Sequence, residues 1–155
     1  MEWERGLWGS AMSGDVAKCE RLLAKGGVAA DDRDSSGYAA LHYAARAGKL
    51  EVCRLLVGRH HADVNATTCK GLATPLHRAA YMGHDDICTY LIEKGARVSE
   101  LDDDGMTPLH KAVQQGREAT VRLLLRHGAD REVRDKHDKR PHDYATSQAT
   151  QAALS

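Results

Sequence analysis

The chain has 155 residues, with 22 basic and 22 acidic side chains and a formal net charge of zero. This length suggests one domain, and the balanced charge provides no general attraction to nucleic acid or to anionic membranes. No apolar run approaches the roughly 18 residues needed to span a bilayer, so neither nucleic acid nor a membrane is expected as a partner.

The compartment is predicted from the N-terminus and the cysteines. The opening sequence MEWERGLWGS contains an acidic residue at position 2 and lacks the apolar core of a secretory signal. The four cysteines show no paired spacing such as C-x-x-C, so a reducing compartment is expected. The sequence therefore predicts a cytoplasmic location, with the nucleus as an alternative.

A short frame recurs four times along the chain. Its copies are GLWGSAMSG, GYAALHYAARAG, GLATPLHRAAYMG and GMTPLHKAVQQG. Each copy places a leucine seven residues before a glycine, and these glycines, at positions 14, 48, 83 and 116, are 34, 35 and 33 residues apart. Self-similarity at this period is typical of a solenoid, in which each unit buries its apolar face against its neighbours.

The frame T-P-L-H-x-A resembles the ankyrin repeat. Thr74–Ala79 and Thr107–Ala112 match it in full, and the resemblance covers roughly residues 3–146. It implies an all-α solenoid of stacked helix-turn-helix units joined by β-hairpin-like fingers, in a single domain over residues 1–148. The expected parts are units over 3–35, 36–68, 69–102 and 103–135, a half-unit cap over 136–148, and a frayed tail over 149–155.

In the first unit, the expected helices run over about residues 4–13 and from the N-cap residue Asp15 to the C-cap signal Gly26-Gly27. Trp8 stands where later units carry histidine. Trp3 and Trp8 are expected to cover the open end of the stack, and partner binding through these aromatic rings is the alternative.

The second unit departs from the family pattern. Ala39-Ala40 replaces Thr-Pro, so its first helix lacks a hydroxyl cap that is typically worth about 0.5–2 kcal/mol. One extra residue lies in Gly58–Ala62 and another in Gly71–Thr74, which together lengthen the step. Both insertions are expected in loops, where added length costs little.

The third and fourth units carry Thr74-Pro75 and Thr107-Pro108 at the predicted starts of their first helices. After them, Pro141 and Ala145 keep part of the frame, but no second helix with an apolar stripe follows. The segment is therefore expected to close the stack as a half-unit.

Polar segments that end near a glycine separate the units and are expected to form the fingers: Asp31–Gly37, Asp63–Gly71, Arg97–Gly105 and Asp130–Asp138. Fingers and first helices together make the concave surface that solenoids use for binding. By the resemblance, variable positions lie beside the frame and finger glycines. The candidate partner-binding residues there are Met12, Ser13, Tyr38, Arg46, Ala47, Leu72, Tyr81, Met82, Met106, Gln114 and Gln115.

Three of these candidates, Tyr81, Met82 and Met106, are bulky and apolar or amphipathic where solvent alone favours polar residues. Packing against the adjacent finger is the alternative for each. The acidic residues Asp102, Asp103 and Asp104 of the third finger are expected to orient a basic stretch of the partner, and a merely solvated acidic face is the alternative.

The recurring histidines are interpreted as structural. His42, His77 and His110 occur once per frame, and the resemblance implies that each ring ties the start of a helix to neighbouring backbone. His60-His61 with Cys69 is the only local metal candidate, and it lacks a fourth ligand. No metal, cofactor or catalytic residue is predicted.

Three cysteines occupy one equivalent position of successive units. Cys19, Cys53 and Cys88 each follow the frame glycine by five residues, and Val121 fills this position in the fourth unit. A position that accepts cysteine or valine indicates a small buried slot. Cys69, in a finger, is the thiol expected to be exposed.

The leading hypothesis is a non-catalytic protein-interaction module or adaptor, monomeric alone, that binds another protein on its concave face. A structural subunit that contacts a larger assembly through its ends or convex face is the alternative. An enzyme, or a redox sensor that depends on Cys69, is the third hypothesis, and no catalytic motif supports it.

Overall fold

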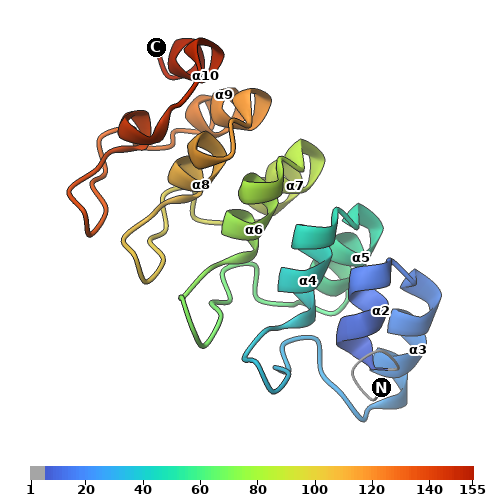
Figure 1. The fold of residues 1–155 in the computed structure, drawn as a ribbon. Coiled ribbons are helices and arrows are strands. Elements are labelled where there is room, and N and C mark those ends of the chain that lie inside the picture. Colours follow the sequence, from blue (N-terminus) through green and yellow to red (C-terminus); the bar gives the residue numbers. More distant parts are fainter. Residues whose placement is uncertain (1–5) are drawn as a thin grey trace.

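The computed structural model describes residues 6–155, which form a row of stacked helix pairs (Figure 1). The inner helices are α2 (Leu7–Ser13), α4 (Ala40–Ala47), α6 (Pro75–Met82), α8 (Pro108–Gln114) and the 3₁₀ helix η2 (Pro141–Tyr144). The outer helices are α3 (Val16–Lys25), α5 (Leu50–Arg54) with its π-helical continuation η1 (Leu55–Arg59), α7 (Asp85–Glu93), α9 (Glu118–Arg126) and α10 (Gln148–Ala153). Residues 6–155 contain no β-strand, and their one isolated β-bridge joins Arg33 to Ala39. The predicted all-α solenoid is therefore confirmed.

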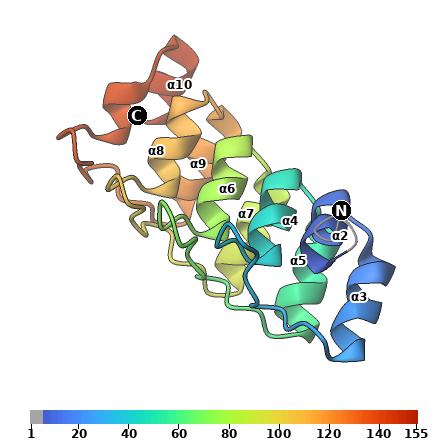
Figure 2. The same ribbon diagram turned by 60° about the horizontal axis from the view of Figure 1, so that its bottom comes forward.

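The inner helices lie side by side, and the fingers project along the same edge of the row (Figure 2). Fingers of neighbouring repeats are joined by backbone hydrogen bonds. Cys69 N donates to Gly37 O at 3.1 Å, and Asp103 N donates to Gly71 O at 2.8 Å. Helices and fingers together form one surface, which we call the inner face.

The Thr-Pro pairs begin α6 and α8 as predicted. The hydroxyl of Thr74 accepts the backbone N–H of His77 (3.3 Å), and Nδ1 of His77 accepts the backbone N–H of Thr74 (3.1 Å). This reciprocal pair satisfies two N–H groups that a helix start leaves without a partner, and proline occupies the next position, where no N–H is needed. Thr107 and His110 repeat the arrangement at the start of α8.

The start of α4 has half of this arrangement. Ala39 has φ −82° and ψ 160°, close to the φ −89° and ψ 166° of Thr74, so the backbone enters both helices in the same way. The backbone N–H of Ala39 donates to Nδ1 of His42 (3.1 Å), but alanine has no hydroxyl to return the bond. The helix therefore starts where predicted, without the side-chain cap.

Each frame histidine also joins its repeat to the following finger. Its Nε2 donates to a backbone carbonyl there, at 2.8 to 3.1 Å: Ala66 and Ala73 for His42, Met106 for His77, and Lys139 for His110. In the first repeat, Nε1 of Trp8 makes the corresponding bond to the carbonyl of Asp32 (3.1 Å). The predicted structural role of the histidines is confirmed, and Trp8 substitutes for one of them. Trp3 lies outside the described residues.

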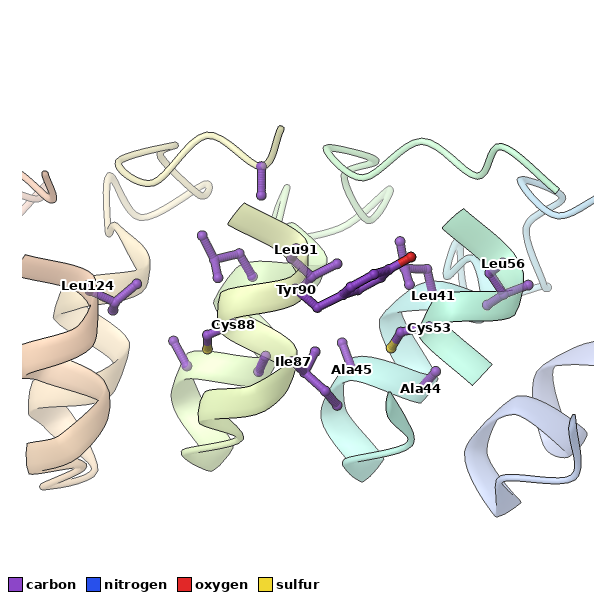
Figure 3. Packing of buried hydrophobic residues seen from close by; sticks show 14 of the residues in the cluster. Leu41, Ala44, Ala45, Cys53, Leu56, Ile87, Cys88, Tyr90, Leu91 and Leu124 are labelled. Carbon is purple, nitrogen blue, oxygen red and sulfur yellow. The ribbon is translucent and has the colours of Figure 1, made fainter. Parts of the chain in front are cut away.

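Small and branched side chains fill the core between the repeats (Figure 3). Ala44 and Ala45 are fully buried and allow the inner helices to approach closely. Tyr90 of α7 is the large exception, because its ring extends toward the outer helix of the second repeat (Figure 3). The guanidinium of Arg54 lies 5.4 Å from the centre of that ring.

The two insertions of the second unit have different outcomes. The prediction of a loop was wrong for the first, because Leu55–Arg59 forms a π-helix that continues α5. A π-turn absorbs one additional residue within a helix, so Leu55 and Leu56 stay buried while the chain still reaches Ala62 in the core. The second insertion lies in a loop as predicted, where Leu72 adopts a positive φ of 49°.

The C-terminal segment also differs from the prediction, because residues 149–155 are not a frayed tail. Ser147 caps α10 by accepting the backbone N–H of Thr150 (3.1 Å). Ala153 and Leu154 are buried against the rest of the stack, and Nη1 of Arg131 donates to the carbonyl of Leu154 (2.8 Å). The two buried side chains, the Ser147 cap and the bond from Arg131 thus order a helix that has no long apolar stripe.

Candidate interaction surface

Two parallel rows of side chains run across the inner helices. Residues three apart on a helix lie on the same face, so α4, α6 and α8 each contribute one residue to each row. The pairs are Tyr43 and Arg46 on α4, Arg78 and Tyr81 on α6, and Lys111 and Gln114 on α8. Across the three helices these positions carry two tyrosines, three basic residues and one glutamine.

A groove of about 360 Å³ lies between these rows and the fingers. Its walls come from the second to fourth repeats. The lining residues are Arg46, Gly71, Ala73, His77, Arg78, Tyr81, Asp102, Asp104 and Lys111. Four predicted partner-binding residues, Arg46, Tyr81, Asp102 and Asp104, are brought together here.

Other predicted residues border the groove or lie farther along the inner face. Leu72 lies between two lining residues, and its side chain is 46% exposed. Tyr38 is half-buried beside Arg78, and its hydroxyl accepts a hydrogen bond from Nη2 of Arg78. Four further predicted residues do not line the groove: Met82 and Gln114 are half-buried, and Asp103 and Gln115 are exposed.

Met106 is not a surface residue, and the prediction that its side chain stands ready for a partner was wrong. Its side chain is only 6% exposed. Its backbone is held on both sides, because the N–H donates to Oδ1 of Asp102 (2.9 Å) and the carbonyl accepts from His77 (2.8 Å). Met106 is thus part of the junction between the third and fourth repeats.

Asp102 also has a structural role that the sequence analysis did not assign to it. Oδ1 accepts the backbone N–H groups of Asp104 and Met106 (both 2.9 Å) and so closes the finger turn. Its other oxygen lies 3.1 Å from Nζ of Lys111. Asp34 and Asp135 close their fingers in the same way, and this recurrence is the sequence signal for the role.

The acidic run of the third finger is matched by the protein itself. Lys136 of the next finger donates to a carboxylate oxygen of Asp104, and this bond lowers the pKa of Asp104 below its usual value. Asp102 is paired with Lys111. Of the three acids, Asp103 makes no ion pair in the described part of the chain and is exposed.

Sequence reasoning missed Arg78 and Lys111, which are central to the groove. Arg78 extends over the ring of Tyr38, with 5.2 Å from the guanidinium carbon to the ring centre. Each of these basic residues precedes a predicted residue, Tyr81 or Gln114, by three positions. Helical spacing from the predicted residues therefore provides a signal that identifies both.

His77, the histidine that lines the groove, is engaged in the structure of the repeat. Both ring nitrogens of His77 are engaged by backbone groups, and burial lowers its pKa, so the ring is neutral at pH 7. A neutral ring with both nitrogens occupied cannot accept a proton from a substrate without losing a structural bond. His77 is thus a structural residue of the junction between the third and fourth repeats.

The cysteines lie as predicted. Cys19, Cys53 and Cys88 are buried, and burial raises their pKa values, to about 11 for Cys19 and about 12 for the other two. Cys69 is the exposed thiol. Across residues 6–155, no group of three or more metal-binding side chains is positioned to hold an ion, and His60 instead lies 3.4 Å from Glu20.

Comparison with known proteins identifies the family. A model described as ankyrin repeats (3 copies) matches residues 6–68 and 60–135. The chain belongs to the ankyrin-repeat family. Helix order, capped helix starts and paired fingers of this ankyrin-repeat chain agree with that match.

Two kinds of curated relative are similar to this chain. Mouse protein phosphatase 1 regulatory subunit 27 is 40% identical to this chain over 92 residues. The alignment covers 59% of this chain and 58% of the mouse protein. Human ankyrin repeat domain-containing protein 39 is 43% identical to this chain over 60 residues. This alignment covers 37% of this chain and 31% of the human protein. The aligned part thus spans less than two thirds of each relative. No helix among residues 6–155 combines the length and apolar character required to cross a membrane.

Proposed function

We propose that this ankyrin-repeat protein is a non-catalytic adaptor that binds a segment of another protein in the groove of its inner face. One observation carries the proposal. A groove of about 360 Å³ is lined by Tyr81, which is 41% exposed, and Leu72, which is 46% exposed, lies in the chain between the lining residues Gly71 and Ala73. Large apolar groups gathered beside a groove are typical of interaction sites, and tyrosine is enriched among residues that dominate binding energy.

The mechanism follows from how firmly the groove is built. His77 fixes the third repeat to the following finger, and Lys111 is held by Asp102. A surface that is already ordered loses little conformational entropy on binding. A flexible partner segment therefore orders on a rigid template.

The relatives support a regulatory kind of partner. The name of the mouse relative describes a regulatory subunit of protein phosphatase 1. This supports a role as the non-catalytic subunit of an enzyme, and a phosphatase catalytic subunit is the first partner to test. The alternative function, a structural subunit of a larger assembly, uses the ends or convex face of the stack.

A capture experiment from cell lysate tests the binding face. The immobilised wild type is compared with the Leu72→Ala/Tyr81→Ala variant and with Leu101→Ala. Leu101 is a control for the loss of an exposed leucine, because it is 48% exposed and is absent from the groove lining, whereas Leu72 has a lining residue on each side in the chain. Circular dichroism and thermal unfolding confirm that each variant is folded.

We expect the double variant to lose a protein that the wild type and Leu101→Ala both retain. Equal retention by all three would favour the convex face or the ends. Cell fractionation of the endogenous protein tests the proposed cytoplasmic or nuclear location, and enrichment in secretory compartments would contradict it.

A further inference from the structure

Three basic side chains reach the groove, but only one has an acidic partner. Lys111 is paired with Asp102 at 3.1 Å. Arg46 and Arg78 also line the groove, and neither lies within ion-pair distance of a carboxylate in residues 6–155. Lys111 and Lys136 pair with Asp102 and Asp104, the two acids that line the groove, so the unmatched charge of the groove lining is positive.

Arg78 is held in one orientation. Nη2 donates to the hydroxyl of Tyr38 at 2.9 Å, and the guanidinium lies over the ring of the same residue. Its Nε is buried without a hydrogen-bond partner among the described residues. An arginine oriented in advance loses less side-chain entropy when it binds a planar anion, and guanidinium groups match carboxylates through paired hydrogen bonds.

Apolar contact area lies directly beside this charge. Tyr81 follows Arg78 by one helical turn on α6 and stands in the same row as Arg46. Leu72, the extra residue of the finger, has a positive φ of 49° and lies in the chain between the lining residues Gly71 and Ala73. An acidic group flanked by an apolar side chain is therefore complementary to this surface in both charge and polarity.

We propose that the groove binds an extended acidic segment of a partner protein, with a carboxylate between Arg46 and Arg78 and an apolar side chain against Tyr81 and Leu72. The proposal rests on the adaptor function above and specifies its ligand. The acidic run of the third finger, taken from the sequence alone, predicts the opposite preference, a basic partner stretch. Asp102 and Asp104 are paired within the protein, and Asp103 lies outside the groove lining, so the groove itself favours an acidic segment.

The test is a nuclear magnetic resonance titration of the ¹⁵N-labelled full chain with a short capped peptide that alternates glutamate and leucine. Glutamine-for-glutamate, lysine-for-glutamate and phosphoserine-for-glutamate peptides are compared with it. We expect the glutamate peptide to shift the amide signals of the groove residues. Loss of its charge-assisted hydrogen bonds should weaken the glutamine peptide by about tenfold or more.

Arg46→Glu is the decisive variant, because Arg46 is exposed and its replacement leaves the Arg78–Tyr38 contact intact. It should weaken the glutamate peptide by about tenfold and make the lysine peptide the better ligand. Arg21→Glu, an exposed reversal on the outer helix α3, is the matched control and should change neither affinity.

Several outcomes would overturn the inference. Equal binding of the glutamine and glutamate peptides would exclude recognition of the carboxylate, and tighter binding of the phosphoserine peptide would assign the site to phosphate. If capture of the cellular partner depends on Leu72 and Tyr81 but not on Arg46, the adaptor function stands and the acidic ligand is wrong. If capture depends on none of the three residues, the adaptor function on the inner face is wrong as well.

Discussion

The second repeat and the third repeat build the same helix pair from different parts. The third begins α6 with Thr74-Pro75 and a complete reciprocal cap. The second begins α4 with Ala39-Ala40 and keeps only the bond to the histidine, and it absorbs an extra residue as a π-turn. Both nevertheless place leucine and histidine in fully buried positions.

The difference shows which parts of the frame determine the fold. Leucine, histidine and the two small residues that follow them are present in both repeats and are buried in both. The hydroxyl and the proline are present in one only, so they adjust stability rather than define the helix start. Four changes in conditions or sequence would sharpen or break this comparison.

Acidification should have the largest effect on stability, because it opposes burial of the neutral histidine that both repeats share. Burial lowers the pKa of His42 from 6.5 to about 4, so the unfolded chain takes up the proton first as pH falls. The contribution of neutral, buried His42 to the free energy of unfolding is therefore complete above about pH 6.5 and is lost as the pH falls toward 4. This shift corresponds to about 3 kcal/mol for His42 alone. Urea unfolding between pH 7 and pH 4 measures it.

The control for acidification is His42→Gln, which cannot take up a proton in this range. Its free energy of unfolding should depend less on pH than that of the wild type. Parallel pH curves for the two proteins would show that His42 does not keep its lowered pKa. His77 and His110, whose pKa values burial also lowers, account for part of the remaining dependence.

Converting the third repeat to the pattern of the second should have the next largest effect. Thr74→Ala/Pro75→Ala removes a buried cap and a rigid first position, so the free energy of unfolding should fall by roughly 1–3 kcal/mol. Urea unfolding at pH 7 measures the change. An unchanged midpoint would mean that His77 alone supplies the full stability of the helix start.

The reverse conversion should produce a smaller gain. Ala39→Thr/Ala40→Pro supplies a hydroxyl at a position with the backbone angles of Thr74, so the free energy of unfolding should rise by about 1 kcal/mol. For a chain of this size, that raises the melting temperature by about 2–4 °C. Calorimetry checks this, with Ala39→Thr alone as the intermediate step. A lower melting temperature would contradict the helix start at Ala40.

Deleting Gly58 should have the smallest effect, because it restores the length found in the third repeat. The π-helix can then close as an α-helix, and the free energy of unfolding should change by less than about 1 kcal/mol. Chemical denaturation measures the change, and deletion of the buried Leu56 is the destabilising control. A large loss on deleting Gly58 would show that the π-turn itself is required by the neighbouring Tyr90.

Much of the fold could be predicted from the sequence, because each repeat restates the same local signals. Thr107 and Pro108 mark a helix start by their chemistry, and the glycine spacing gives the register of the stack. The π-turn could not be predicted in this way, since one extra residue fits either a loop or a helix. The burial of Ala153 and Leu154 at the end of α10 also depends on a tertiary contact, which cannot be predicted from a short alanine-rich segment.

The candidate site was predicted less completely for a related reason. Exposed positions such as Tyr81 follow from helical spacing, but the pairing of charges between fingers depends on the distance between repeats. Asp104 meets Lys136, which lies 32 residues later, and this contact changes the charge presented to a partner. Met106 is likewise buried by a junction that forms only when two repeats are stacked.

The direction of the histidine bonds gives the stack a temporal order during synthesis. Every frame histidine donates to a carbonyl that lies later in the chain, 24 and 31 residues later for His42 and 29 residues later for His77 and His110. A ribosome releases these acceptors only after the histidine itself has emerged. Each of these histidines can therefore complete its Nε2 hydrogen bond only when the next finger has left the exit tunnel. In a growing chain, the histidine of the most recently synthesised repeat lacks this bond.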